Sequence, residues 1–246
     1  MTSSENSFSI LSTVDSTNNY AMGKVHEGLA KHGDAFFALE QTAGKGQRGK
    51  QWLAADGQNI ILSIVVEPFQ LKIAQQFHLS AAVALGCYDF FSGYAGDETK
   101  IKWPNDIYWR DRKAGGVLIE TIHRGADWKY AVIGIGLNIN QTTFGESLKK
   151  VVSLKQITGK ENDVIALSKE LQFFVLKRIE QIYSTPFNDL LKEYNQYLFK
   201  LNEPVKLRKD NIIFETSIQS VNAEGKLITK DALERELNFD SVEWVL

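Results

Sequence analysis

The sequence predicts an α+β fold in which a mixed, mostly antiparallel sheet is backed by helices and followed by a small β-barrel. Strand-like runs follow one another with short connections, whereas parallel pairs need a crossover of about a dozen residues. Two long segments have the composition and apolar spacing of helices. Beyond residue 202 the pattern changes to short alternating strands. We therefore expect a main domain over residues 1–198 and the barrel over 199–246.

The individual elements follow in order along the chain. Helix-capping side chains from Asp15 onward precede a helix that we expect to end near Gly33. β-Branched and aromatic runs predict strands at 35–39 and 60–68, and again at 100–103, 116–121 and 130–136. Helices are predicted at 74–91, 163–183 and 187–199. The barrel strands are predicted at 204–207, 212–221, 226–229 and 241–245.

Composition limits the class of protein. With 246 residues, of which 43% are hydrophobic, the chain can bury a substantial core. The net charge of -2 and the pI near 6.1 provide no global basic field for DNA or an anionic membrane. The single cysteine, Cys87, excludes an internal disulfide framework and favours a reducing compartment. Without a signal peptide or an apolar run of about 20 residues, we expect a soluble, cytoplasmic protein.

The most informative stretch is residues 44–50, with the sequence GKGQRGK. It matches the dinucleotide motif G-x-G-x-x-G and a P-loop that lacks only its Ser or Thr, since Gln51 stands there. Both motifs require a helix directly after the loop, but a turn-rich segment and a strand follow here. We therefore exclude both and predict a glycine loop between two strands. Lys45, Arg48 and Lys50 supply the positive charge with which such a loop approaches an anion.

Three further pieces carry chemistry. In the segment 102–106, Pro104 ends a strand and places Asn105 and Asp106 on a turn. Lys113 stands beside two glycines at the entry of the next strand, and 134–140 has small residues against which a ligand could lie. Singly, these are also explained by an ordinary turn, a solvated hairpin lysine and a β-bulge or close strand packing.

Together and in this order, the motifs resemble those of the biotin–protein ligases. They comprise residues 16–18, 41–52, 102–106, 113–120 and 134–140. The resemblance covers nearly the whole chain. It implies a catalytic domain similar to those of class II aminoacyl-tRNA synthetases and a C-terminal SH3-like barrel. About fifteen residues precede the first motif, so we expect a short form without an N-terminal DNA-binding domain.

The resemblance implies a two-step reaction with ATP, biotin and Mg²⁺. Biotin and MgATP give biotinyl-5′-AMP, and a lysine of a biotin carboxyl carrier protein domain then attacks the mixed anhydride. That domain would belong to acetyl-CoA carboxylase or a related biotin-dependent enzyme. We expect no cluster of protein ligands for the metal and no DNA or membrane partner. Lipoate–protein ligase or octanoyltransferase-like acyl transfer and a non-catalytic biotin-binding regulator remain alternatives, and both a monomer and a homodimer remain open.

The resemblance also assigns residues to roles. Lys113 would clamp the biotin carboxylate and the α-phosphate, Arg48 would neutralise phosphate, and Asp106 would orient or deprotonate the attacking lysine. The expected biotin contacts are Ser16, Thr17, Asn18, Gln41, Gly44, Lys45, Gly46, Gln47, Lys113, Gly115 and Gly116. The expected ATP or adenylate contacts are Arg48, Lys50, Trp52, Asn105, Lys113 and Asn138.

The glycine loop departs from the family pattern. Loops of the family are commonly richer in arginine, whereas Lys45, Gln47 and Lys50 stand at three such positions. Arginine grips phosphate with two donors and lysine acts as a point charge, so closure would be less tight. From its glycines and like charges we expect the loop to be disordered without ligand and to order over biotinyl-AMP.

Overall fold

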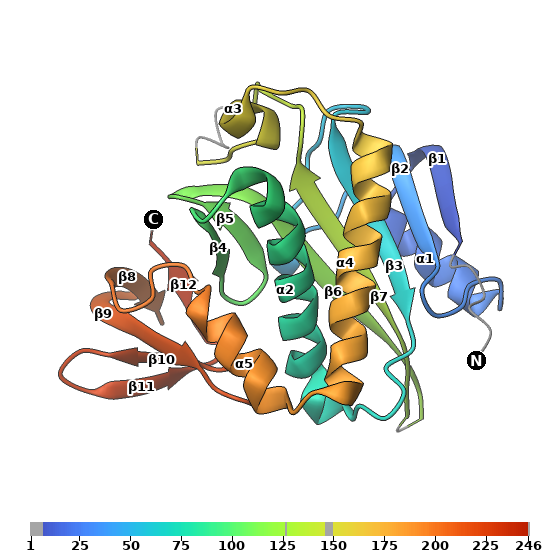
Figure 1. Ribbon diagram of the computed structural model, residues 1–246. Coiled ribbons are helices and arrows are strands. Elements are labelled where there is room, and N and C mark those ends of the chain that lie inside the picture. The colour runs from blue at the N-terminus through green and yellow to red at the C-terminus, as the bar shows by residue number, and fades with distance from the viewer. Residues whose placement is uncertain (1–6, 126, 146–149, 246) are drawn as a thin grey trace.

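The computed structural model describes residues 7–125, 127–145 and 150–245 (Figure 1). Its larger sheet has seven strands in the order β1-β2-β3-β7-β6-β5-β4. The strands are β1 (Phe8–Val14), β2 (Ala35–Gln41), β3 (Asn59–Val66), β4 (Thr99–Lys102), β5 (Asp106–Trp109), β6 (Arg112–Arg124) and β7 (Asp127–Asn138).

Pairing in this sheet is mixed, as the sequence predicted. Strands β1 and β2 pair in parallel, and the other neighbours pair antiparallel. A parallel pair needs a crossover, and α1 (Thr17–His26) supplies it between β1 and β2. The helix ends earlier than residue 33, because Gly28 takes a φ of 70° and turns the chain.

Helices cover both faces of the sheet. On one face lie α2 (Gln76–Ala95) and α4 (Val164–Ser184), side by side in Figure 1. Gly86 permits their close approach, because a Cβ there would lie 2.7 Å from the Cα of Val175. Helix α1 covers the opposite face, where Ala21 packs with Phe36, whereas Phe37 belongs to the core under α2. The alternation of side chains along β2 thus divides its residues between two cores.

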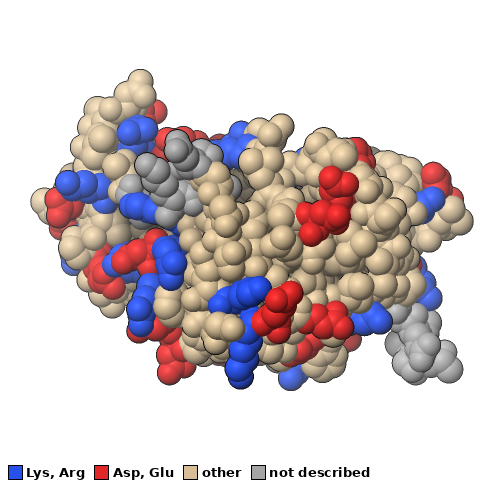
Figure 2. Space-filling view, turned by 90° about the horizontal axis from the view of Figure 1, so that it is seen from above, with Lys and Arg blue, Asp and Glu red and all other residues tan. Residues whose placement is uncertain are grey.

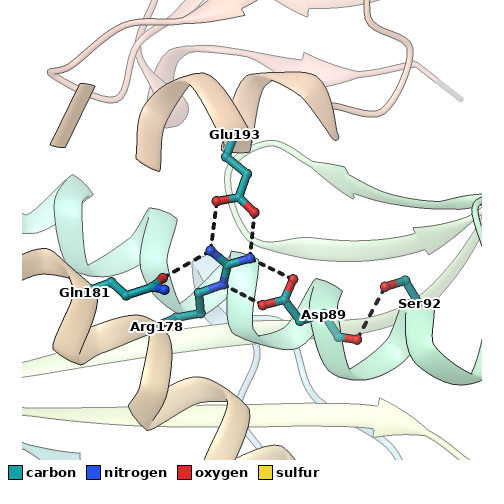
Figure 3. Close-up of polar contacts among 5 residues, drawn as sticks. All are labelled: Asp89, Ser92, Arg178, Gln181 and Glu193. Carbon is teal, nitrogen blue, oxygen red and sulfur yellow. Dashed lines mark hydrogen bonds and ion pairs between the residues drawn. The ribbon is translucent and has the colours of Figure 1, made fainter. Parts of the chain in front are cut away.

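A half-buried ion cluster ties three helices together (Figure 3). The guanidinium of Arg178 on α4 binds Asp89 on α2 at 2.9 Å and Glu193 on α5 (Phe187–Gln196) at 2.6 Å. It also donates to Gln181 at 3.1 Å. The short α3 (Leu154–Thr158) follows β7 in the chain and packs against α2. Because α5 leads into the second sheet, this cluster fixes where that sheet begins.

The second sheet has five strands in the order β11-β10-β9-β8-β12, all paired antiparallel. They are β8 (Pro204–Lys209), β9 (Ile212–Val221), β10 (Leu227–Lys230), β11 (Glu234–Leu237) and β12 (Glu243–Trp244). Closure would require the two outer strands to pair, but the described residues show an open sheet whose edge strand β12 is two residues long. The predicted SH3-like barrel is therefore not confirmed.

The domain boundary near residue 198 stays a prediction. Leu207 and Ile218 of the second sheet belong to the same continuous core as Leu190 and Leu198. Cys87 is fully buried in that core, as expected for a small apolar residue. Among the described residues, no helix combines the length and apolar character that a membrane span requires.

Candidate functional site

A cavity of about 460 Å³ opens between the α1 face of the large sheet, the glycine loop and the C-terminal segment. It brings together residues from all five sequence motifs. The predicted site residues in its wall are Ser16, Thr17, Asn18, Gln41, Lys45, Gly46, Gln47, Arg48, Lys50, Trp52, Asn105, Asp106, Lys113, Gly116 and Asn138. Figure 2 shows basic and acidic side chains interspersed on one face of the molecule.

One end of the cavity holds a buried, uncharged hydrogen-bond network at the start of α1. Thr17 is 3% exposed, and its backbone N–H donates to Gln41 Oε1 at 2.7 Å. Thr17 Oγ1 lies 3.1 Å from the same oxygen and 2.8 Å from Ser63 Oγ. Ser63 was not predicted; it lies on β3, fully buried, and donates to Asn18 Oδ1 at 2.6 Å. This end therefore presents fixed neutral donors and acceptors.

The floor below the network is a glycine on β7. A Cβ at Gly134 would lie 2.4 Å from Asn18 Oδ1. On its other side Asn18 donates to Glu120 Oε2 at 2.7 Å, and Glu120 Oε1 accepts from Lys45 at 3.2 Å. The small residues of the 134–140 motif thus make room for the side chains that form the cavity.

The glycine loop folds back on itself. Gly46 N donates to Lys50 O at 2.7 Å, and Trp52 N donates to Gly44 O at 2.9 Å. A side chain at Gly44 would collide with the backbone, since a Cβ there would lie 2.4 Å from Trp52 O. The loop was predicted to be disordered without ligand, and that hypothesis stays a prediction.

Arg48 binds the C-terminal segment 239–244. It takes a left-handed φ of 54°, and its guanidinium donates to the carbonyl oxygens of Phe239 and Val242. It also lies 4.3 Å from the centre of the Phe239 ring and 3.8 Å from a Glu243 oxygen. These contacts place residues about 190 positions apart in one wall. To neutralise phosphate as predicted, Arg48 would have to exchange some of these partners.

The other end of the cavity holds two of the predicted catalytic residues, Lys113 and Asp106, which form an ion pair. Lys113 Nζ lies 2.7 Å from Asp106 Oδ1, with side chains 30% and 19% exposed. The backbone of Lys113 is held by hydrogen bonds with Lys150 and Val152. A Cβ at Gly116 would lie 2.9 Å from Asp106 Oδ1, so this glycine leaves the pair its space.

Between the two ends lie residues assigned to the adenylate. The Trp52 indole covers Gly136, where a Cβ would lie 2.4 Å from the ring. Asn105 donates to Val117 O, and the buried Asn138 donates to Val152 O at 3.3 Å. Trp52 Nε1 is buried without a hydrogen-bond partner in the described part of the chain. Such an orphaned donor in a cavity wall suits a polar ligand atom.

Lys102 is a wall residue that sequence reasoning missed. Its ammonium lies 5.2 Å from the ring centres of Tyr108 and Trp244. Burial, together with the charges of Lys113 and Lys50, lowers its pKa to about 8, against the opposing effect of Asp106. Its position as the first residue of the 102–106 motif is the signal that could have identified it.

Other wall residues were given no individual role from the sequence, and two predicted glycines lie outside the wall. Gly44 and Gly115 do not line the cavity; a Cβ at Gly115 would lie 2.5 Å from Gly136 O, so it serves strand packing. The additional wall residues are Gln51, Leu53, Ile61, Lys102, Trp103, Pro104, Val117, Leu118, Gly134, Ile135, Gly136, Phe144, Val151, Phe239, Val242, Glu243 and Trp244.

The arrangement suits a ligand with an uncharged, hydrogen-bonding head at one end and anionic groups at the other. Comparisons with known proteins show the family. Residues 10–138 match the model of the biotin/lipoate A/B protein ligase family. The chain is 32% identical to the bifunctional ligase/repressor BirA of Escherichia coli (strain K12), over 90% of this chain and 68% of that protein. It is 31% identical to the biotin--[acetyl-CoA-carboxylase] ligase of Mycobacterium tuberculosis, over 54% of this chain and 49% of that protein. The chain belongs to the biotin/lipoate A/B protein ligase family.

Solved structures agree on the fold. A mutant of the biotin protein ligase from Aquifex aeolicus, in complex with biotin, has a TM-score of 0.81 at 22% identity. The match covers 97% of this chain and 98% of that chain. The ligase from the same organism in complex with biotin and ATP has a TM-score of 0.78 at 22% identity, covering 98% of this chain and 95% of that one. The protein thus has a biotin protein ligase-like fold, with a mixed sheet backed by helices.

Proposed function

We propose that the protein is an ATP-dependent biotin–protein ligase. It activates biotin as biotinyl-5′-AMP and transfers it to a lysine of a biotin carboxyl carrier protein domain. Family membership and the names of the relatives support this proposal. The observation that carries it is one cavity with a buried neutral network at Thr17 and Gln41 and cations at Lys50 and Lys113.

The neutral network favours biotin over lipoate. The ureido ring of biotin carries two N–H donors and a carbonyl acceptor, which match hydroxyl and amide partners. The dithiolane ring of lipoate carries neither a strong donor nor a strong acceptor. A buried polar group left without a partner costs about 1–3 kcal/mol. Thr17 and Gln41 would therefore bind biotin better than lipoate.

The cationic end fits the first step. A biotin carboxylate oxygen attacks the α-phosphorus, the bond to the bridging oxygen breaks, and pyrophosphate leaves with the electron pair. Two anions must approach, so the developing charge needs fixed cations. Lys113 would clamp the carboxylate and the α-phosphate, and Lys50 and Arg48 would neutralise phosphate. Asp106, which faces Lys113 at 2.7 Å, would hold that ammonium in place beforehand.

The second step joins the acceptor. The amine of the acceptor lysine attacks the carbonyl carbon of the anhydride, AMP leaves, and the nitrogen gives up a proton. An unperturbed lysine has a pKa of about 10.4 and is mostly protonated at neutral pH. Asp106 would orient that ammonium and accept its proton.

Magnesium would enter as the counter-ion of ATP. Within the described ranges there is no group of three or more His, Cys, Asp or Glu side chains that could hold a metal ion. The carboxylates and amides assigned to the wall on the nucleotide side are Asp106, Glu243, Asn105 and Asn138. This set can orient a nucleotide-bound Mg²⁺ but is a weak cage for the free ion.

The proposal also covers the acceptor protein and the location in the cell. The names of relatives from Mycobacterium tuberculosis and Paracoccus denitrificans favour the carrier domain of acetyl-CoA carboxylase. We further propose that the protein acts in the cytoplasm and that its second sheet corresponds to an SH3-like domain. That the protein does not bind DNA stays a prediction.

Label transfer tests the proposal. Labelled biotin, MgATP and a purified carrier domain are incubated with the wild type, Lys113→Ala and the control Lys129→Ala. Lys129 also pairs with a carboxylate, at 3.0 Å, but outside the cavity. We expect transfer by the wild type and the control and at least a 100-fold loss in Lys113→Ala. In a parallel assay with labelled lipoate, transfer of lipoate instead of biotin would favour the rival ligase. Binding of biotin without its transfer would favour a regulator.

A further inference from the structure

Glu120 places a carboxylate beside two parts of the site that are far apart in the sequence. Side chains alternate along a strand, so Gly116, Leu118 and Glu120 share the cavity face of β6. Gly116 and Leu118 line the cavity, and Glu120 lies one step beyond them. The carboxylate therefore stands at the edge of the wall, where it touches other side chains that line the cavity.

One carboxylate joins helix α1 to the glycine loop. Its Oε2 accepts from Asn18 Nδ2 at 2.7 Å, and its Oε1 accepts from Lys45 Nζ at 3.2 Å. Asn18 is 3% exposed, whereas the side chains of Glu120 and Lys45 are 29% and 40% exposed. Hydrogen bonds to an ionised group are about twice as strong as neutral ones. The buried Asn18 contact should thus carry more energy than the exposed Lys45 contact.

The charge on Glu120 determines which groups of the network donate hydrogen bonds and which accept them. An ionised carboxylate only accepts, so Asn18 must turn its NH₂ group to Glu120 and its oxygen to Ser63. The Ser63 hydroxyl has one proton, and it donates this proton in a hydrogen bond to Asn18 Oδ1 at 2.6 Å. The Thr17 hydroxyl then donates to the Ser63 or Gln41 oxygen, and either choice leaves Thr17 Oγ1 free to accept from a ligand.

Gln41 contributes a hydrogen-bond donor to the same network. Its Oε1 accepts from the backbone of Thr17, so its NH₂ group remains a donor towards a ligand. An accepting Thr17 oxygen and a donating Gln41 nitrogen complement the N–H and C=O of a ureido group. The Thr17 hydroxyl is oriented through Ser63 and Asn18 by Glu120, which does not line the cavity, whereas the Thr17 backbone N–H orients Gln41.

We propose that Glu120 is a positioning residue that orients the biotin-head network through Asn18 and holds the glycine loop against it through Lys45. The inference rests on the proposed function, because it takes the ureido ring of biotin as the ligand of the network. It adds a residue whose two contacts can be separated by substitution.

Three variants separate the two contacts. Glu120→Ala removes both. Glu120→Gln keeps an oxygen that can accept from Asn18 but loses the charge that attracts Lys45. Lys45→Met removes the loop contact alone. Glu40→Gln is the control, since Glu40 is an exposed carboxylate on the same sheet that accepts from Thr13 at 3.1 Å.

Biotin binding is measured by calorimetry without ATP or acceptor. We expect about 10-fold weaker binding for Glu120→Ala, equivalent to about 1.4 kcal/mol. Glu120→Gln and Glu40→Gln should stay within about 3-fold of the wild type. In the full reaction, Glu120→Ala should raise the KM for biotin about 10-fold and leave kcat within about 3-fold. Rescue by the glutamine variant distinguishes orientation of Asn18 from a general loss of structure, and thermal melts verify folding.

The loop contact has its own readout. Limited proteolysis within residues 44–50 should be several-fold faster in Glu120→Gln and Lys45→Met than in the wild type and Glu40→Gln. Biotin binding by Glu120→Ala that equals the wild type, or a glutamine variant as weak as the alanine variant, would overturn the proposal. So would equal cleavage of the loop in all four proteins. A wild type that binds biotin but transfers none would count against the proposed ligase and leave the Glu120 comparison intact.

Discussion

Gly134→Ala should weaken biotin binding through one added methyl group. The new Cβ would lie 2.4 Å from Asn18 Oδ1, where ordinary contacts begin near 3.4 Å. The backbone of Gly134 does not have the positive φ that would itself forbid alanine. Asn18 must therefore retreat by about 1 Å from the floor of the cavity.

The magnitude follows from the bonds that Asn18 makes. Its contacts with Ser63 and Glu120 are 2.6 and 2.7 Å long, and a retreat of about 1 Å takes at least one of them past the range of a hydrogen bond. Losing a hydrogen bond to a charged group costs about 1.5–3 kcal/mol. Since about 1.4 kcal/mol is tenfold, we expect biotin binding to weaken about 10- to 100-fold.

Calorimetry with biotin and with ATP, each alone, tests this reasoning, and Gly136→Ala is the matched control. The same methyl group two residues further along β7 would meet the Trp52 ring at 2.4 Å instead of Asn18. Gly134→Ala should lose biotin affinity and keep ATP affinity within about 3-fold, whereas Gly136→Ala should lose ATP affinity more than biotin affinity. Unchanged biotin binding in Gly134→Ala, or the same loss in both variants, would refute the argument.

Three other predictions concern charge, stability and the loop. The pKa of Lys102, lowered to about 8 first by burial, means that its ammonium loses charge between about pH 7 and 9. ATP binding measured by calorimetry should weaken over that window, and a Lys102→Met protein with the same pH slope would contradict this. Arg178→Met leaves two carboxylates of Figure 3 unpaired and should cost about 2–4 kcal/mol in urea unfolding, because breaking a buried pair costs about 3–5 kcal/mol and these side chains are partly exposed. The control Lys24→Met, which breaks a surface ion pair with Glu27, should lose much less stability, and an equal loss would contradict the prediction. Phe239→Ala removes the ring on which the Arg48 guanidinium lies but keeps its carbonyl partners, and should speed proteolysis within residues 44–50 several-fold; an unchanged rate would show that this ring does not hold the loop.

The long helices and central strands were predictable because local patterns specify them. The predicted helix 163–183 agrees closely with α4, whose N-cap Asp163 accepts from Ile165 N and Ala166 N. The predicted strands 116–121 and 130–136 lie inside the longer β6 and β7. Apolar periodicity and capping are local properties, so a single sequence reveals them.

The shorter elements escaped prediction for a different reason. Strand β1 lies at the edge of the sheet and is half exposed, so its apolar alternation is weak. Strand β5 has four residues directly after the predicted turn, and Asp106 pairs with Lys102 across that turn. Strand β11 carries charged residues along most of its length. Pairing partners stabilise these strands, and no local pattern contains the partner.

The sequence by itself determined the ordered motifs, the basic glycine loop and nearly half of the residues that line the cavity. Only the tertiary structure decided that Ser63 and Glu120 join the hydrogen-bond network of Thr17, Asn18 and Gln41. It also decided that the segment 239–244 completes the cavity wall and that Gly44 and Gly115 lie outside it. Sequence motifs identify which residues along the chain the chemistry requires. The contact between Asn18 and Glu120, 102 residues apart, depends on strand order and register, which arise when the whole sheet pairs.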